Sequence, residues 1–174
     1  NDVTGLLEDF DSNRSGGIIA INLRDGDELV GAALIGPEDD LLLVSQQAQA
    51  IRFHATDEVL RPMGRATSGV IGMRFSENDE LLAMEVVRHG MDVLVATGGG
   101  YAKRTPIEEY PVQGRGGKGV VTAKITQRRG ELVGAVVINQ EDELFAITSN
   151  GGVIRTPVKP VRRTRDRNTM GVKL

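Results

Sequence analysis

The sequence predicts an all-β repeat protein, and three observations lead to this prediction. A similar block of sequence recurs about every 50 residues along the 174-residue chain. Each recurrence contains short runs rich in Val, Ile and Leu, bounded by Gly, Asn, Asp or Pro, which is typical of β-strands. Glycine is frequent, at 22 residues, as expected when many short elements are joined by tight turns.

The repeat is clearest where a Glu-Leu pair begins an apolar run. Glu28, Glu80 and Glu131 mark the three copies, in steps of 52 and 51 residues. The copies of this first block are residues 26–32 (GDELVGA), 78–84 (NDELLAM) and 129–135 (RGELVGA). Two further blocks keep the same spacing: DLLLVS, DVLVAT and ELFAIT, beginning at residues 40, 92 and 143, and AIR, AKR and VIR, beginning at residues 50, 102 and 153.

These copies divide the chain into blades of about 50 residues. We expect residues 1–25 to end a preceding blade, followed by blades at 26–77, 78–128 and 129–174, of which the last can be incomplete. In the second blade the expected strands lie at residues 81–87, 93–96, 100–103 and 120–125. A four-stranded unit repeated at this period is the pattern of a β-propeller or a related radial array. Since propellers typically need about 4–8 blades, the chain is expected to be a fragment or to lack some units.

Charge is distributed unevenly along the chain. Residues 1–92 hold 7 Lys and Arg against 17 Asp and Glu, whereas residues 93–174 hold 14 against 7. From Val153 onward there are 7 basic residues and one acid, Asp166. The basic end is either an ordinary solvated surface or a stripe that meets phosphates.

Several classes of function find no residue support. The chain has no cysteine, which excludes disulfides and thiolate metal sites, and its two histidines, His54 and His89, lie far apart without further ligands. No apolar run approaches the ~20 residues needed to cross a bilayer. We therefore predict no catalytic residue, no metal site and no bound cofactor in this chain, and no membrane partner.

One glycine-rich loop combines backbone freedom with positive charge. Four glycines in seven residues allow the backbone to approach another surface closely, and two cations stand beside them, which suits contact with a phosphate backbone. The loop, residues 113–119, consists of Gln113, Gly114, Arg115, Gly116, Gly117, Lys118 and Gly119. The spacing of Gly114, Gly116 and Gly119 also matches the dinucleotide pattern GxGxxG, but the following VVTAKI predicts a strand where that fingerprint requires a helix.

The glycine-rich loop resembles the basic box of the DNA gyrase A family, read as Gln-Arg-Arg-Gly-Gly-Lys-Gly, with Gly114 in place of an arginine. The repeat extends the resemblance over essentially the whole chain, which looks like part of an actinobacterial C-terminal domain. The resemblance implies a β-pinwheel, a propeller-like ring whose blades exchange strands and which wraps duplex DNA around a basic outer rim. Whether this loop is the principal box or a secondary copy stays open, because of Gly114.

The resemblance also implies a larger enzyme around this chain. The whole protein would be an ATP-dependent type II topoisomerase, an isomerase that uses ATP and Mg²⁺ and introduces negative supercoils. Its partners would be double-stranded DNA, the rest of gyrase A, and gyrase B, in the bacterial cytoplasm and at the nucleoid. The cleavage tyrosine of the family follows an arginine in another domain, whereas Tyr101 follows Gly100 and Tyr110 follows Glu109.

Beyond the glycine-rich loop, the cations expected to contact phosphates lie at a repeated post-strand position and in a basic segment that corresponds to the glycine-rich loop one unit later. These are Lys103, Arg104, Arg155, Arg162, Arg163, Arg165 and Arg167. Two alternatives stay open: the C-terminal domain of topoisomerase IV, and, in a different class, a propeller-type scaffold that binds proteins, which the acidic first half favours.

Overall fold

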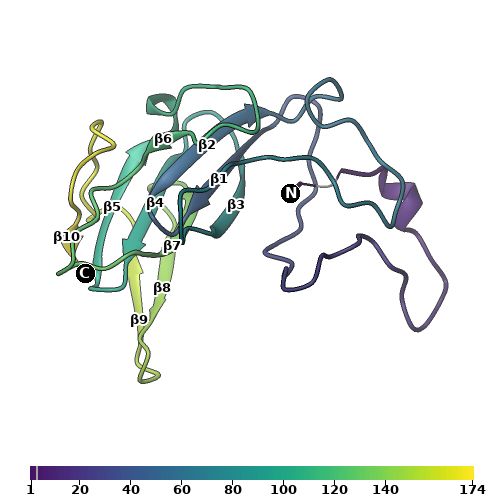
Figure 1. Ribbon diagram of the computed structural model, residues 1–174. Helices are drawn as coiled ribbons and strands as arrows, with labels where there is room; N and C mark the ends of the chain where they lie inside the picture. Colours follow the sequence, from purple (N-terminus) through teal and green to yellow (C-terminus); the bar gives the residue numbers. More distant parts are fainter. Residues whose placement is uncertain (3) are drawn as a thin grey trace.

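The computed structural model describes residues 1–2 and 4–174, and its regular structure is almost entirely β (Figure 1), which confirms the all-β prediction. The two exceptions among the described residues are single turns of 3-10 helix, η1 (Leu7–Phe10) and η2 (Ile107–Glu109). The strands are β1 (Asp40–Ser45), β2 (Gln49–His54), β3 (Leu81–Val87), β4 (Asp92–Thr97), β5 (Tyr101–Pro106), β6 (Val120–Val121), β7 (Leu132–Ile138), β8 (Glu143–Ile147), β9 (Val153–Pro157) and β10 (Val172–Lys173).

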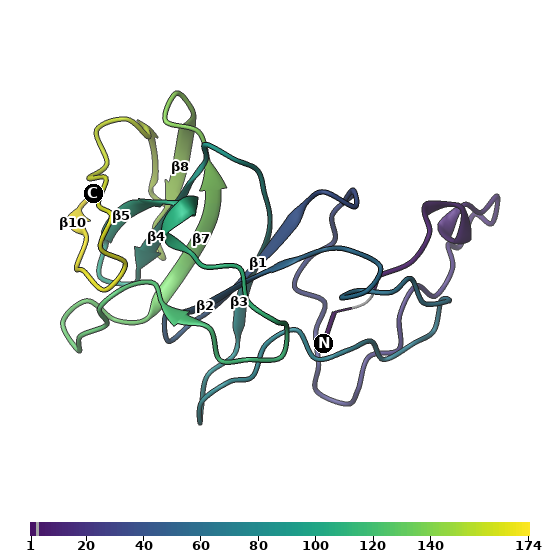
Figure 2. The same ribbon diagram turned by 90° about the horizontal axis from the view of Figure 1, so that it is seen from above.

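The strands form two four-stranded antiparallel sheets and one hairpin, and each four-stranded sheet draws on distant parts of the chain. The first sheet has the order β3-β1-β2-β6 and the second the order β10-β5-β4-β7, while β8 pairs only with β9 (Figures 1 and 2). The four runs expected within residues 78–128 are thus divided between two sheets, since β3 and β6 join the first and β4 and β5 the second. Neighbouring sheets therefore exchange strands.

The central hairpins repeat the same register. Leu43 lies opposite Ile51 in the β1–β2 pair, and Val95 lies opposite Lys103 in the β4–β5 pair. The pairing with the outer strand shifts at the same point in both sheets, after Val44 in β1 and after Ala96 in β4. The two sheets are therefore copies of one backbone design.

The strand expected at residues 120–125 is shorter than the apolar run. Val120 and Val121 pair with the first two residues of β2, Ala50 and Gln49. Beyond that point the partner strand has ended, and the next amide, that of Thr122, donates to Ala48 in the hairpin turn. The length of β6 is thus set by where its partner begins, which apolar periodicity does not reveal.

The core lies between and beside the sheets. One cluster, which includes Leu42 and Val44 of β1 and Val93 and Val95 of β4, is buried together with Leu132 of β7. The opposite face of β1 is also buried, through a second cluster, and Leu94 of β4 belongs to a third. Burial on both faces explains why these central strands read as nearly continuous apolar runs.

The first 39 residues extend away from the sheets as an arch (Figures 1 and 2). Among the residues described there, regular structure is limited to η1 and an isolated bridge between Asp2 and Val70. Residues 26–32 match β3 and β7 in sequence but form no strand, and Leu29 and Val30 are exposed. The reason is the exchange of strands: β3 and β7 pair with a hairpin about 40 residues earlier, and no such hairpin precedes Glu28 in the described part.

Candidate nucleic-acid interface

The glycine-rich loop lies between η2 and β6, and its backbone is hydrogen-bonded to β2 and to the segment between β2 and β3. The amide of Gln113 donates to Arg52 O at 2.8 Å, and that of Gly116 to Gly72 O at 2.6 Å. The carbonyl of Gly117 accepts from Arg74 N at 2.9 Å. Because these hydrogen bonds fix both halves of the loop, its conformation is set before any ligand arrives.

The glycines are needed mainly because the loop packs closely against its neighbours, and less because they expose the backbone. Gly119 has a φ of +77°, and a Cβ there would lie 2.1 Å from Ala50 O, so any side chain would collide with β2. Gly116 has a φ of +80°, in the region that favours glycine. Only Gly114 among the three faces open space, with nothing within 4 Å of a Cβ.

The two cations of the glycine-rich loop are both exposed but differ in their bonding. Arg115 donates from Nε to Val59 O at 2.8 Å and from Nη1 to Ile71 O at 3.1 Å, so its guanidinium is partly committed to the chain itself. Lys118 makes no side-chain hydrogen bond or ion pair with any described residue. Lys118 is therefore the freer of the two charges.

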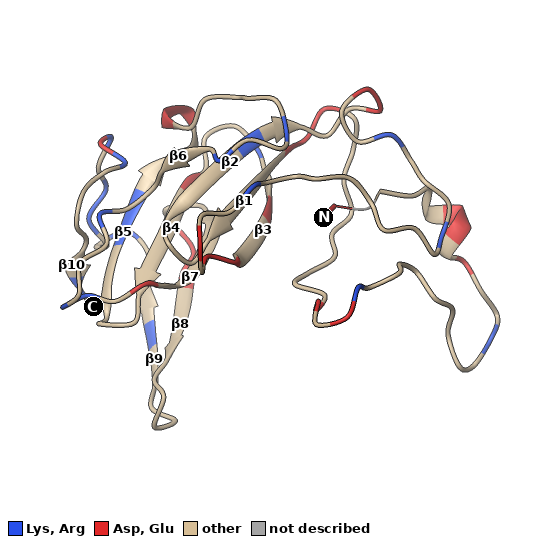
Figure 3. Ribbon diagram, viewed as in Figure 1, with Lys and Arg blue, Asp and Glu red and all other residues tan. Residues whose placement is uncertain are grey.

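The second basic segment, residues 162–170, precedes β10 and is called the arginine loop below. It begins beside β5, where Arg104 N donates to Arg162 O and Thr164 N donates to Arg104 O, both at 2.9 Å. Arg162 is exposed, and the Arg165 side chain is 85 % exposed, with Nε 3.9 Å from Glu109 Oε1. Figure 3 shows this loop as basic segments around one acidic residue.

The remaining two arginines of the arginine loop contact buried groups. Arg163 donates from Nε to both oxygens of Asp92, at 2.9 and 3.1 Å, and this bond raises the pKa of Arg163 above its ordinary value. The guanidinium of Arg167 lies over the ring of Tyr110, 6.0 Å from its centroid. Both side chains are therefore directed by the fold.

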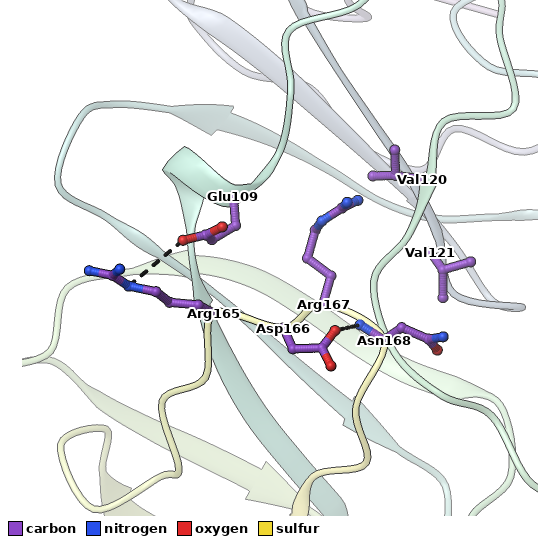
Figure 4. A pocket seen from close by; sticks show the side chains of 7 residues that line it. All are labelled: Glu109, Val120, Val121, Arg165, Asp166, Arg167 and Asn168. Atoms are coloured by element: carbon purple, nitrogen blue, oxygen red, sulfur yellow. Dashed lines mark hydrogen bonds and ion pairs between the residues drawn. The ribbon is translucent and has the colours of Figure 1, made fainter.

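A groove of about 410 Å³ lies between the arginine loop and β6 (Figure 4). One wall is β6, which directly follows the glycine-rich loop, and the other is the arginine loop, so the groove lies where neighbouring sheets meet. In Figure 4 the Arg167 side chain extends towards Val120, while Arg165 reaches to Glu109. The residues lining the groove are Glu109, Val120, Val121, Arg165, Asp166, Arg167 and Asn168.

Lys103 and Arg104 do not lie on an outer surface. Lys103 is 1 % exposed, and its Nζ donates to Asp166 O and Thr169 Oγ1, each at 3.2 Å, and to Arg167 O. Arg104 is 6 % exposed and donates to Asp92 and to two backbone carbonyls. Both cations serve the interior, which residue type and sequence position did not indicate.

Arg155 holds the same repeat position as Arg104 but is exposed. Its Nε donates to Glu143 Oε2 at 2.9 Å, and its guanidinium lies 6.0 Å from the centroid of the Phe145 ring. Its charge is thus neutralised in part by Glu143. Sequence reasoning missed this partner, although an acid lies 12 residues before the arginine in every repeat: Asp40 and Arg52, Asp92 and Arg104, Glu143 and Arg155.

Tyr110 is a buried support that the sequence did not indicate. Its hydroxyl hydrogen-bonds the Thr122 hydroxyl, and burial raises the pKa of Tyr110 to about 12. Its carbonyl and that of Ile107 face Arg52 Nη1, at 3.4 and 3.1 Å. Tyr110, directly after η2, therefore bonds the residue that directly follows β6.

Most acids lie away from the two loops, and two acids line the groove. Figure 3 shows acidic segments in the arch and around η1, whereas Lys and Arg gather near β5, β10 and the arginine loop. These two acids are Glu109 of η2 and Asp166 of the arginine loop. The acidic and basic residues, which are unevenly distributed along the sequence, are therefore also unevenly distributed in the structure.

Neither a metal centre nor a membrane span emerges from the described residues. Within residues 1–2 and 4–174 no group of three His, Asp or Glu side chains is placed to hold a metal ion. No helix in that part of the chain is long and apolar enough to cross a membrane.

A family model described as "DNA gyrase C-terminal domain, beta-propeller" matches residues 6–35, 39–88, 92–139 and 142–174. The chain belongs to this family. The match covers the glycine-rich loop and the arginine loop, so both are parts of a gyrase C-terminal domain.

Curated relatives agree with this assignment. DNA gyrase A of Mycobacterium tuberculosis is 66 % identical over 168 residues, which is 97 % of this chain and 20 % of that protein. DNA gyrase A of Streptomyces coelicolor is 64 % identical over 173 residues, with the same coverage. The chain thus spans about a fifth of the length of these relatives, and the actinobacterial resemblance predicted from the sequence is confirmed.

Solved structures agree on the fold. The C-terminal domain of DNA topoisomerase IV superposes with a TM-score of 0.88 at 23 % identity, covering 97 % of this chain and 52 % of that one. The DNA gyrase A C-terminal domain superposes with a TM-score of 0.83 at 24 % identity, covering 91 % and 54 %. Together with the exchanged strands, these likenesses confirm the β-pinwheel class.

Proposed function

We propose that this gyrase C-terminal domain binds duplex DNA by its backbone and bends it around the edge formed by the glycine-rich loop and the arginine loop. The observation that carries the proposal is the groove between β6 and the arginine loop: Arg165 and Arg167 line it, and the exposed Lys118 lies two residues before its other wall, β6. Lys118, Arg162 and Arg165 are the exposed cations proposed to meet phosphates, with Arg167 at the groove wall.

Charge, rather than base recognition, is proposed to supply most of the affinity. Each phosphate neutralised by a cation releases counterion, which gives a salt slope near −0.9 per contact. Bending a site of 20–30 bp costs on the order of 1–6 kcal/mol, which several ionic contacts along a curve can exceed. Flexible side chains beside a docked loop offer no rigid element for the major groove, so any sequence preference should come from DNA deformability.

The other predicted contact residues take different parts in this proposal. Gly116, Gly117 and Gly119 shape the glycine-rich loop, and Arg115 braces it while leaving its charge at the surface. Arg163 and Arg104 hold the arginine loop to β4 and β5 through Asp92. Arg155, which is exposed, is available to DNA only in competition with Glu143.

Within a whole gyrase, the bound duplex would be presented for strand passage. We propose that the parent protein is an ATP-dependent type II topoisomerase, using Mg²⁺ and gyrase B, and that a wrap of one hand biases it towards negative supercoils in the bacterial cytoplasm and nucleoid. This chain contributes DNA binding and no bond chemistry. Wrapping in one hand is tested by the linking number of relaxed DNA circles that are religated in the presence of this chain. The linking number should shift consistently in one direction.

A salt titration tests the DNA-binding edge directly. Affinity for duplex DNA should fall steeply as salt rises, and Arg162→Ala with Arg165→Ala should reduce the slope of log affinity against log salt by about two. The matched control is Arg14→Ala with Arg24→Ala, which changes the net charge equally but on the exposed arch. Equal losses in both double variants would contradict the proposed edge, and absence of binding at low salt would favour a protein-interaction scaffold.

A further inference from the structure

Lys103 joins the hairpin of the second sheet to the arginine loop. It lies in β5, with its ammonium under the turn of that loop, where it donates to the carbonyls of Asp166 and Arg167 and to the Thr169 hydroxyl. These partners are more than 60 residues away along the chain. One side chain thus connects β5 to the second part of the loop that carries the exposed arginines.

The other two hairpins place isoleucine at this position. Ile51 occupies it in β2 and Ile154 in β9, and all three residues have equivalent partners on the neighbouring strand: Leu43, Val95 and Ala146. Ile51 is buried under the glycine-rich loop, with its Cδ1 3.5 Å from where a Cβ on Gly117 would lie. The hairpin therefore accepts an apolar side chain at this position, so the lysine in β5 has a local cause.

The cause of a lysine at this position lies in the arginine loop, which differs from the glycine-rich loop. Each loop lies in a stretch that runs from a parallel bridge on a hairpin to a glycine that packs on the hairpin backbone. The stretch of the arginine loop, from Arg163 to Gly171, is one residue longer than that of the glycine-rich loop, from Val112 to Gly119. It has no glycine before Gly171. Two carbonyls of this longer stretch, those of Asp166 and Arg167, face the buried Lys103 side chain, which supplies their donor.

The ammonium is held there against the effect of burial. Burial lowers the pKa of Lys103 to about 8, with Asp166 opposing this lowering and Arg167 and Arg162 adding to it. Charge-assisted hydrogen bonds to three oxygens offset the loss of hydration. The Lys103 ammonium therefore donates its hydrogen bonds to acceptors of its own chain.

We propose that Lys103 is a positioning residue, which tethers the arginine loop so that Arg162 and Arg165 face outwards, and which does not itself touch DNA. Its effect on DNA binding rests on the proposed function, whereas the tether can be measured without DNA. A direct contact and a tether differ in their salt signature, because only a phosphate contact releases counterion.

The test uses Lys103→Ile, which copies the side chain of the other two hairpins. Without DNA, the amide of Thr164, which donates to Arg104 O, should exchange its hydrogen about tenfold faster or more, because the charged anchor is lost. Amides of β1, such as Leu42, should exchange at an unchanged rate. DNA affinity should fall several-fold while the salt slope stays within about 0.3 of the original value.

Arg162→Ala provides the opposite pattern as a control. It should reduce the salt slope by about 0.9 and leave the exchange of Thr164 unchanged. If Lys103→Ile instead lowers the slope by about 0.9 with unchanged exchange, Lys103 contacts phosphate and the tether is refuted. Failure of the unaltered chain to bind DNA would refute the proposed function and leave the exchange measurement decisive for the tether.

Thr169→Val covers the case in which Lys103→Ile does not fold. It removes one acceptor of Lys103 and the hydroxyl that bonds Asp166 O, and it leaves the hairpin intact. Faster exchange of Thr164 in this variant supports the tether, and an unchanged rate overturns it.

Discussion

Asp92 accepts a hydrogen bond from Arg104 across 3.0 Å, and both side chains are buried. The same carboxylate accepts from Arg163 in the arginine loop at 2.9 Å. The remaining donors of Arg104 reach Val161 O and Lys159 O, each at 3.0 Å. One acid at the start of β4 therefore joins the hairpin to the loop proposed to bind DNA.

The same pairing occurs in the other hairpins with different burial. Arg52 and Asp40 are buried, at 2.6 Å, and two carbonyls of the η2 segment face the guanidinium. Arg155 and Glu143 are exposed, and no equivalent segment covers them in the described part of the chain. Burial of each pair thus depends on the segment that follows the next hairpin along the chain.

Substitution of Asp92 by alanine should destabilise the domain by about 3–5 kcal/mol, because it leaves the buried charge of Arg104 without a partner. Glu143→Ala, at the equivalent exposed pair, should cost less than about 1 kcal/mol. Urea unfolding of both variants measures the difference. Equal costs would mean that burial of the pair at β4 carries no consequence for stability.

Gly119→Ala should destabilise the domain by about 2 kcal/mol or more, since the new Cβ meets the backbone of Ala50 and the residue has a positive φ. Gly114→Ala, in the same loop, should stay within about 0.5 kcal/mol of the original because nothing lies near its Cβ. Thermal or urea unfolding compares the two. A small effect at Gly119 would show that the loop is not docked on β2.

The pKa of Tyr110, raised to about 12, predicts a loss of stability in strong base. The folded chain keeps the phenolic proton where the unfolded chain, with its ordinary value of 10.0, releases it. The stabilisation is complete below pH 10 and is lost as pH rises through 12. Since the chain has only two tyrosines, the ultraviolet absorbance of Tyr101→Phe reports Tyr110 alone, and a midpoint near 10 would contradict its burial.

The pKa of Lys103, lowered to about 8 from 10.5, acts with the opposite sign. Between these values the folded chain binds fewer protons than the unfolded chain, so the free energy of unfolding should gain a rising contribution as pH increases from 8 to 10.5. Below pH 8 this contribution is absent. Urea unfolding across that range should show the rise in the original chain and not in Lys103→Ile; parallel profiles would place Lys103 in solvent.

The strands themselves were largely predictable from local sequence. Runs such as DLLLVS and DVLVAT read as strands because both faces are buried, and the repeat was visible in their recurrence. The division of residues 78–128 between two sheets was not visible in those runs, because the residues of a strand do not indicate which strand it pairs with. The unpaired segment at residues 26–32 shows the same point, since it matches β7 and yet forms no strand.

The candidate site shows the same limit for charged residues. Gln113 to Gly119 could be found as a loop because glycine and cations are visible one residue at a time. The roles of Lys103 and Arg104 could not, because a lysine or arginine in a strand reads as surface charge unless its acceptors are known, and all of these except Asp92 lie 55 to 66 residues away.

Residue type and spacing along the chain were enough to establish the repeat, the β class, the glycine-rich loop and the gathering of cations in the second half. Three features depended on the folded arrangement: which strands share a sheet, which cations face solvent, and that the arginine loop and β6, from different repeats, line one groove. The physical reason is that burial and partnership arise from contacts between distant segments, and those contacts exist only once the strands have been exchanged between sheets.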